Sequence, residues 1–264
     1  MRRAVRNSGN RHELRLKAGG KGAETTRMGR HSISRLAAVW AVSLLAWPAA
    51  QAADLSDIER RWLAGLWPVI EHARQSHLPL DIVVQPQPTP GLAPLALAFV
   101  GGRCKLVLSM RGNAEAAATL ERISPDLMGA TLELMAAHEL GHCRRYLEGA
   151  WLAGPAGFAA DAAANLPPAL RSAWLAMQAQ RREEGYGDLV GLAWTRQRHP
   201  ALYPRLQAWL LAERSRDRVP GSSHDTLAWV KRAGAGAALD PSADAPTIYE
   251  AAARVWESGL ADDE

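Results

Sequence analysis

The segment His138–His142 reads His-Glu-Leu-Gly-His and constrains the fold more than any other feature of this chain. Histidines four residues apart share one face of a helix, about 6 Å from each other, so both rings can bind one zinc ion. Glu139 is turned by about 100° around the helix axis, so its carboxylate can reach a water on that metal without becoming a ligand. The pattern predicts a helix with a zinc-binding face and makes Glu139 the candidate catalytic base. The alternative is that both histidines lie on a solvated helix face.

A catalytic zinc site takes three protein ligands and keeps one position for water, so a third ligand is needed. Glu184 and Asp188 lie downstream, four residues apart, on one face of a second expected helix. We expect Glu184 to bind the metal and Asp188 to accept the free ring N–H of a ligand histidine. Glu183 is the fallback ligand. If Glu184 binds, Glu183 points away, and we expect its removal to have little effect.

Three glycines favour close packing of these two helices. Gly141 lies inside the motif, and Gly185 and Gly187 lie inside the second expected helix. A glycine in a helix interior is about 1 kcal/mol less favourable than alanine, so its presence needs a reason. Missing side chains let two backbones approach closely, as a glutamate reaching a shared metal requires. The alternative is that Gly185 and Gly187 break the helix.

Together the two segments resemble the gluzincin metallopeptidases, which pair His-Glu-x-x-His with a downstream Glu-x-x-x-Asp. The pattern is matched residue by residue by His138, Glu139, His142, Glu184 and Asp188. The resemblance covers only these two helices and implies a zinc peptidase. Arg144 departs from it, because an apolar residue is usual at that position. The metzincins, which add a third histidine, do not fit, because positions 145 and 148 are arginine and glutamate.

In such an enzyme zinc polarises the scissile carbonyl, and the base takes a proton from water and passes it to the leaving amine. Charge builds on the carbonyl oxygen, so a nearby donor is expected. We select His224, which lies downstream of the third ligand at an expected helix start. The alternative is that a preceding serine caps that helix and His224 is an ordinary surface residue. Tyr186 and Tyr203 are the lesser candidates for this role.

These residues predict a zinc-dependent peptidase acting on peptide or protein substrates. A second hypothesis is a catalytically idle, metallopeptidase-like zinc-binding or assembly protein of the cell envelope. Glu139 argues against it, because a structural zinc site does not need that carboxylate. A third is a scaffold tethered to a membrane by the amino-terminal apolar run. The sequence contains no glycine-rich phosphate loop and no serine nucleophile elbow.

The amino terminus predicts export. Residues 28–52 contain a short basic region, the apolar run 36–50 and a small-x-small site, which are the parts of a secretory signal peptide. The run is shorter than the roughly twenty residues of a membrane span, and an uncleaved anchor is the alternative. Residues 1–27 are expected to be a dispensable or mis-called leader. We expect 53–264 to form a single metallopeptidase-like domain, exported to the periplasm or secreted, with no stable membrane span after cleavage.

Export also affects how charge and cysteine content are interpreted. Residues 1–52 hold ten of the 31 Lys and Arg residues but only two of the 27 Asp and Glu, so 53–264 is net −4. The basic balance of the whole chain is therefore no evidence for a nucleic-acid partner. Cys104 and Cys143 are the only cysteines. In an oxidising compartment an even pair suggests a disulfide, and two unpaired buried thiols are the alternative.

Periodicity and turn residues predict the remaining elements. We expect a helix over 55–76, strands at 80–86, 95–100 and 103–109, a short helix after Asn113, a helix from Ser124 to about Leu147, a loop or lid over 150–168, and helices near 169–198, 201–215, 223–233 and 246–259. By analogy with gluzincins, strand 103–109 would pair with extended substrate; an ordinary sheet strand is the alternative. The fold class is α+β: a mainly helical zincin-like domain with a small early β-sheet next to the motif helix.

Overall fold

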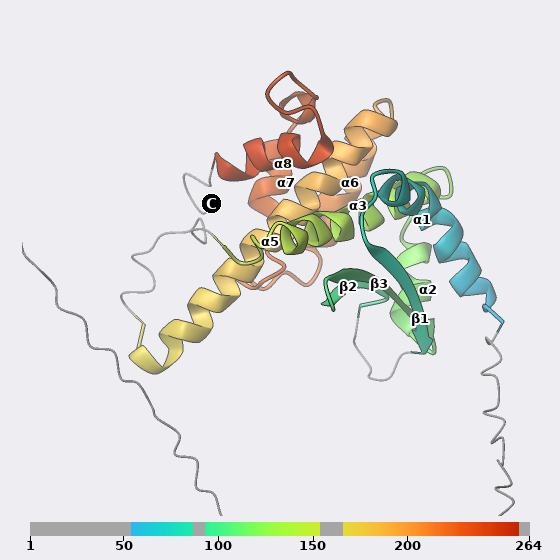
Figure 1. Cartoon of the computed structure of the whole chain (residues 1–264), viewed down its shortest axis with the longest axis horizontal. Helices are drawn as coiled ribbons and strands as arrows, with labels where there is room; N and C mark the ends of the chain where they lie inside the picture. The colour runs from blue at the N-terminus through green and yellow to red at the C-terminus, as the bar shows by residue number, and fades with distance from the viewer. Residues whose placement is uncertain (1–53, 87–92, 154–165, 259–264) are drawn as a thin grey trace, which may run out of the picture. The chain divides into compact units, whose positions relative to one another are not determined.

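The computed structural model describes residues 54–86, 93–153 and 166–258, all within one compact unit, Ala52–Glu264 (Figure 1). Its helices are α1 (Asp57–Gln75), α2 (Ala114–Glu121), α3 (Met128–Leu147), α5 (Pro168–Arg198), α6 (Tyr203–Ser215), α7 (Leu227–Ala233) and α8 (Ile248–Glu257), with a short 3-10 helix at Ala237–Leu239. Its strands are β1 (Leu80–Pro86), β2 (Leu95–Val100) and β3 (Arg103–Arg111). This architecture confirms the predicted fold class, mainly helical α+β with a small early sheet.

The three strands form one sheet in the order β1-β3-β2. β2 and β3 make the predicted antiparallel hairpin, turning through Gly101 and Gly102 at φ 61° and 75°, values that favour glycine. β1 pairs with β3 in parallel. The expectation that residues 103–109 pair with substrate is wrong, because β3 is the central strand and its hydrogen bonds are used on both sides. Within the described residues, the free edge near α3 belongs to β2.

The motif helix begins later than the sequence predicts. Its first residue is Met128, with Leu127 at the cap position and no side-chain cap. The N–H of Leu127 bonds to the carbonyl of Ser124 at 2.9 Å, and the N–H of Met128 reaches the carbonyl of Pro125. These bonds span three residues, so 124–127 forms a tight turn ahead of the helix. The predicted end at Leu147 is confirmed.

α3 and α5 pack with their backbones almost in contact. A Cβ added at Gly141 would lie 3.3 Å from the Cα of Gly187, and one added at Gly191 would lie 2.8 Å from the carbonyl oxygen of Leu134. Helix α5 is unbroken through these glycines. Gly185 has another reason: a Cβ there would meet the Trp229 ring of α7 at 2.4 Å. The sequence therefore identified the close approach but assigned Gly185 to the wrong neighbour and missed Gly191.

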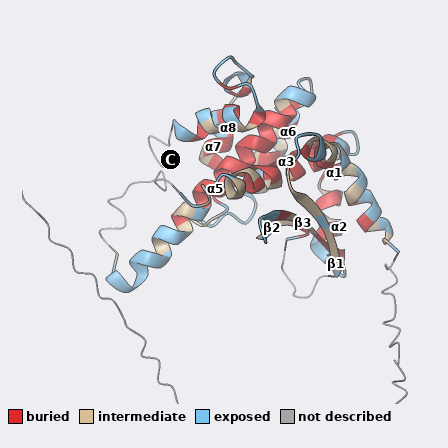
Figure 2. Ribbon diagram, in the orientation of Figure 1, coloured by how far each residue is buried: buried red, intermediate tan, exposed pale blue. Residues whose placement is uncertain are grey.

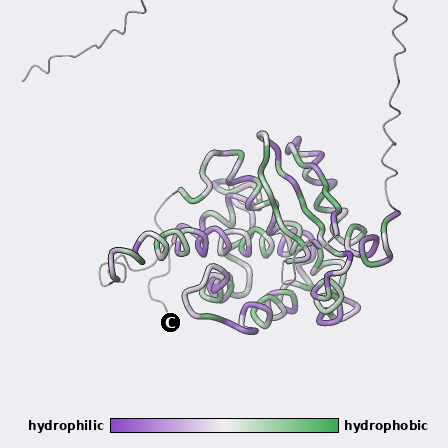
Figure 3. The backbone as a smooth tube through the Cα atoms, turned by 90° about the horizontal axis from the view of Figure 1, so that it is seen from below, coloured by the Kyte–Doolittle hydropathy of each residue, from purple (hydrophilic) through white to green (hydrophobic). Residues whose placement is uncertain are grey.

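Burial is concentrated where α3 and α5 cross, whereas the first turns of α5 are exposed (Figure 2). Hydrophobic and hydrophilic residues alternate along that exposed part (Figure 3).

Cys104 of β3 and Cys143 of α3 form a disulfide with their Cα atoms 5.7 Å apart, so the sheet is tied covalently to the motif helix. No described helix is long and apolar enough to span a bilayer. The expected leader, signal peptide and most of the expected lid lie outside the described residues.

Candidate metal centre

The three predicted ligands come together between α3 and α5. The Nε2 atoms of His138 and His142 are 3.0 Å apart. Glu184 of α5 places one carboxylate oxygen 3.3 Å from the His138 Nε2 atom and the other 3.6 Å from the His142 Nε2 atom. All three ligand atoms lie within 4.8 Å of one another, and this group can hold a metal ion. Both histidines are buried, so the alternative of a solvated helix face is wrong.

The orientation of His138 indicates that this group fits a cation. Its Nδ1 atom lies 3.0 Å from the Asp188 carboxylate, which is the partner predicted for a ligand histidine. A proton held between them leaves the Nε2 atom with a lone pair directed at His142 and Glu184. Three electron-rich atoms at this separation repel one another unless a positive charge lies between them. Two imidazoles and a carboxylate also suit a divalent transition metal.

The electrostatics of the cluster favour positive charge at the same point. Burial alone would lower the pKa of His138, but the Asp188 and Glu184 carboxylates outweigh it and raise that pKa to about 10. Burial alone would raise the pKa of Glu184, but hydrogen bonding to His138 and the nearby imidazoles lower it to about 2. The cluster therefore keeps a carboxylate anion beside the two rings, and a proton or a metal ion is stabilised there.

Asp188 is held by two further residues that the sequence did not single out. Arg214 of α6 donates to both of its oxygens, at 2.8 and 2.6 Å, and the Thr226 hydroxyl donates to one of them. Burial would raise the pKa of Asp188, but Arg214 and the hydrogen bond with His138 hold it well below its usual range. Arg214 lies among several arginines before a turn, and no pattern in the sequence distinguishes it from them.

The second ligand histidine is held differently. The Nδ1 atom of His142 is buried and has no hydrogen-bond partner among the described residues. The ring instead meets Trp151 edge-on, with centroids 5.3 Å apart. Burial, followed by the neighbouring His138, lowers the pKa of His142 to about 3, so its ring is neutral and has a lone pair available for a metal.

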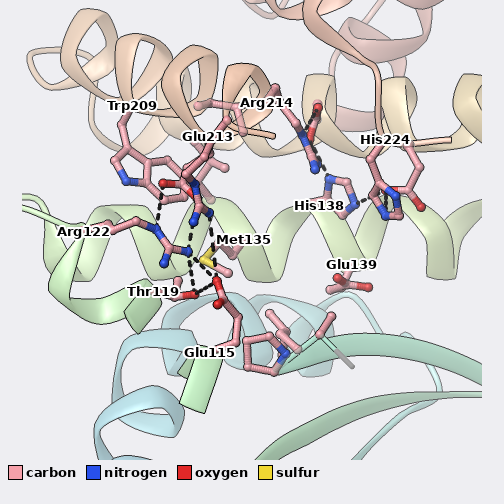
Figure 4. Close-up of a pocket in the computed structure, with 18 residues that line it drawn as sticks. Glu115, Thr119, Arg122, Met135, His138, Glu139, Trp209, Glu213, Arg214 and His224 are labelled. Atoms are coloured by element: carbon pink, nitrogen blue, oxygen red, sulfur yellow. Dashed lines mark hydrogen bonds and ion pairs between the residues drawn. The ribbon is translucent and has the colours of Figure 1, made fainter. Parts of the chain in front are cut away.

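Glu139 lies on the side of α3 that faces the sheet, and His138 lies on the side that faces α5 and α6 (Figure 4). Burial raises the pKa of Glu139 to about 7, and Glu184 adds to this, whereas His138 and Arg214 oppose it. The nearby backbone of Leu97 in β2 also opposes the rise in this pKa. Glu139 is therefore next to the metal ligands without being one of them, as the motif predicts.

One cleft of about 290 Å³ contains His138, Glu139 and Glu184 and is also lined by His224. His224 is exposed over 65% of its side chain, and its Nε2 atom lies 3.8 Å from Glu184. The predicted helix start is wrong by a few residues: α7 begins at Leu227, and His224 lies in the preceding turn. Neither preceding serine caps α7. The geometry brings His224 to the cleft.

The lesser candidates and the fallback ligand lie elsewhere. The Tyr186 hydroxyl donates to a backbone carbonyl of α8, and the Tyr203 hydroxyl donates to one at the end of α7, so neither hydroxyl lines the cleft. Glu183 points away from the cluster and accepts two hydrogen bonds from Arg145, at 3.0 and 2.8 Å, and one from the backbone N–H of Leu152. Of the two neighbouring glutamates, only Glu184 belongs to the group that can hold a metal ion.

The cleft thus borders a group that can hold a metal ion, and it is also lined by a carboxylate one residue along the helix and an imidazole at the rim. Such a set can bind a cation, position a water and move a proton. Comparison of the chain with family models, with curated proteins and with solved structures finds no match.

Proposed function

We propose that this chain is a zinc-dependent peptidase of the gluzincin type. The observation that carries the proposal is the convergence of His138, His142 and Glu184 within 4.8 Å. This group borders a cleft that is lined by His138, Glu139 and Glu184. Two imidazoles and one carboxylate are a ligand set that catalytic zinc sites use while leaving a position open for water. A purely structural site would need a fourth protein ligand instead of an adjacent carboxylate.

Zinc, when bound, would polarise the scissile carbonyl and make water a stronger acid. Glu139 would take a proton from the attacking water and deliver it to the leaving amine. Asp188, fixed by Arg214, would hold the proton on the Nδ1 atom of His138 and keep that ring oriented. His224, exposed at the rim, would donate a hydrogen bond to the carbonyl oxygen as charge develops there.

The edge of β2 is suited to hold an extended peptide beside this site. The N–H of Ser109 bonds to the carbonyl of Pro94, so even-numbered residues of β2 direct their backbone groups at β3. The odd-numbered residues, among them Leu97 and Phe99, direct theirs at the free edge. Leu95 of β2 lines the same cleft as His138 and Glu139, which supports an extended substrate lying along this edge beside the candidate metal ligands. A substrate strand added here would gain main-chain hydrogen bonds.

The disulfide supports the proposed exported location. Disulfides persist in oxidising compartments such as the periplasm and the extracellular space and are rare in the cytosol. Cys104 and Cys143 are the only cysteines of the chain and they are paired. Protein recovered from culture medium or periplasm should begin near Ala53, which amino-terminal sequencing would check. Recovery of intact Met28 from the cytosol would contradict export.

The test compares wild type with Glu139→Gln and His138→Ala for zinc content and for cleavage of a general peptide library. We expect about one zinc per wild-type chain, zinc without cleavage in Glu139→Gln, and neither in His138→Ala. The glutamine variant keeps size and shape and removes only the base. Protein that takes up no zinc would refute the proposal. If wild type and Glu139→Gln both bind zinc and neither cleaves any peptide, the chain would instead be the idle binding or assembly protein.

A further inference from the structure

A bridge of four charged side chains spans the cleft beside the metal centre. Arg122 bonds to Glu115 at 2.7 Å and to Glu213 at 3.1 Å, and Arg216 reaches the same two carboxylates. All four residues line the cleft that is also lined by His138 and Glu184, two of the three candidate metal ligands. We call these residues, Glu115, Arg122, Glu213 and Arg216, the charged bridge. None of them belongs to the metal-binding pattern or to its supporting hydrogen bonds.

The charged bridge joins two different sides of the cleft. Glu115 belongs to α2 and Arg122 is the cap residue at its end, whereas Glu213 belongs to α6 and Arg216 caps that helix. Figure 4 shows Arg122 between Glu115 and Glu213, with Met135 between this group and His138. The bridge therefore closes the cleft at the end toward the amino terminus of α3, and it is held by charge pairs between α2 and α6.

Met135 of α3 lies between the bridge and the candidate metal ligands (Figure 4). Met135 precedes His138 by three residues, a rise of about 4.5 Å along α3. An extended peptide advances about 3.4 Å per residue. One or two residues of an extended chain therefore cover the rise from His138 to Met135, and the bridge lies just beyond Met135 in Figure 4.

The direction of β2 determines which residues of a substrate these would be. β2 starts at Leu95, and Ala93, Pro94 and Leu95 line the cleft together with the bridge. Antiparallel pairing is somewhat more stable per residue than parallel pairing. A peptide antiparallel to β2 therefore has its carboxyl-terminal part at the Leu95 end, next to the bridge.

We propose that the charged bridge limits the substrate to one or two residues on the carboxyl side of the scissile bond, so that the chain trims carboxyl termini. The inference rests on the proposed peptidase function. The chemical class of substrate is an extended peptide with a free carboxyl end, and the released product is an amino acid or a dipeptide. A chain cleaved in its interior would have to displace the ion pairs that join α2 to α6.

The test uses zinc-loaded full chain and a peptide series with one constant amino-terminal half. The part after the cleaved bond is one, two, four or eight residues long. Cleavage is followed by mass spectrometry, and binding is followed separately with zinc-loaded Glu139→Gln, which keeps the bridge. We expect peptides with four or eight residues after the cleaved bond to bind at least about tenfold more weakly than those with one or two. Their cleavage at that bond should fall by a similar factor.

Two bridge variants and one matched control sharpen the test. Arg122→Ala and Glu213→Ala weaken the bridge from opposite sides, because each removes at least one of its ion pairs. We expect either variant to accept more residues after the cleaved bond and to cleave farther from the carboxyl end. Arg205→Ala is the control, because Arg205 of α6 also pairs across to another segment, at Asp126, but does not line the cleft. It should leave the length limit unchanged.

Each result supports or overturns the inference. Equal binding and cleavage of long and short peptides overturns the inference while leaving the peptidase proposal standing. A limit on the amino side of the bond, or a limit unaffected by both bridge variants, also overturns it. A chain that neither binds nor cleaves any member overturns the inference together with the proposed function. A length limit seen in binding alone supports the bridge as a barrier even if the peptidase proposal fails.

Discussion

Two neighbouring glutamates on α5 have different environments. Glu184 faces α3 and completes a group that can hold a metal ion. Glu183 is 1% exposed, and it forms an ion pair with Arg145 while accepting the N–H of Leu152. The two side chains are chemically identical and differ by about 100° of rotation around the helix axis. Their roles are therefore determined by what packs on each face of α5.

The difference separates two roles on one helix: Glu184 belongs to the group that can hold a metal ion, and Glu183 contributes to packing. The face with Glu184 and Asp188 carries one member of the group that can hold a metal ion, and its carboxylates are balanced by imidazoles and Arg214. The face about 100° away carries Glu183, which joins α5 to the end of α3 and to the turn beyond it. Variants of the Glu184 face should therefore change zinc affinity, and variants of the Glu183 face should change the free energy of unfolding. Both can be measured without knowing the substrate.

The largest expected effect is on metal affinity. Glu184→Ala removes one of three protein ligands, so we expect zinc affinity to fall by more than the roughly 100-fold that loss of a partner beyond the ligands gives. Competition with a chelator of known affinity measures it. Glu183→Ala should retain wild-type zinc affinity. If instead Glu183→Ala released zinc and Glu184→Ala did not, the assignment of the two faces would be reversed.

The second effect is on stability. Glu183→Ala leaves Arg145 without its carboxylate in a largely buried position, so we expect the free energy of unfolding to fall by about 3 kcal/mol. Denaturant unfolding of the metal-free protein measures the loss without a contribution from zinc. This result would correct the expectation from sequence that removing Glu183 matters little. An unfolding midpoint equal to wild type would show that the pair with Arg145 contributes nothing.

The third effect is smaller because it acts on a ligand indirectly. Asp188→Asn keeps the shape of the side chain but removes the anion that orients His138, and we expect zinc affinity or activity to fall by about 10–100-fold. The matched change at the other histidine is Trp151→Leu. It removes the aromatic contact that His142 has in place of a hydrogen bond. It should have the lesser effect on zinc affinity. Equal losses in the two variants would remove the distinction between the histidines.

The smallest effects come from a matched pair of glycines. A Cβ at Gly187 would lie 2.8 Å from atoms of the His138 ring, and one at Gly185 would lie 2.4 Å from Trp229. Both Gly→Ala changes overpack the interior and should lower the free energy of unfolding by about 1–3 kcal/mol. Only Gly187→Ala should also weaken zinc binding, as titration of the two refolded variants would show. Weakened zinc binding in Gly185→Ala alone would contradict the packing of α5.

Much of the fold could be predicted because its signals are local. Alternation and helical spacing located the strands and the long helices within a few residues. Boundaries failed where a short turn competed with a cap, as at Ser124, whose carbonyl closes a turn before α3 begins at Met128. The centre of the metal site was also predictable, because residues four apart must share a helix face. The role of Arg214 could not be predicted, because an arginine near the end of a helix is common and nothing in the sequence marks this one.

The sequence by itself determined which side chains can hold a metal. The spacing of His138 and His142, and of Glu184 and Asp188, fixes each pair on one face of its helix. Only the tertiary structure decided what meets those faces. In the tertiary structure β2 rather than β3 is the edge strand, and Arg214 and Thr226 donate hydrogen bonds to Asp188. Glu183 forms an ion pair with Arg145. The physical reason is range: helix periodicity acts within four residues, whereas these contacts join segments 26 to 38 residues apart.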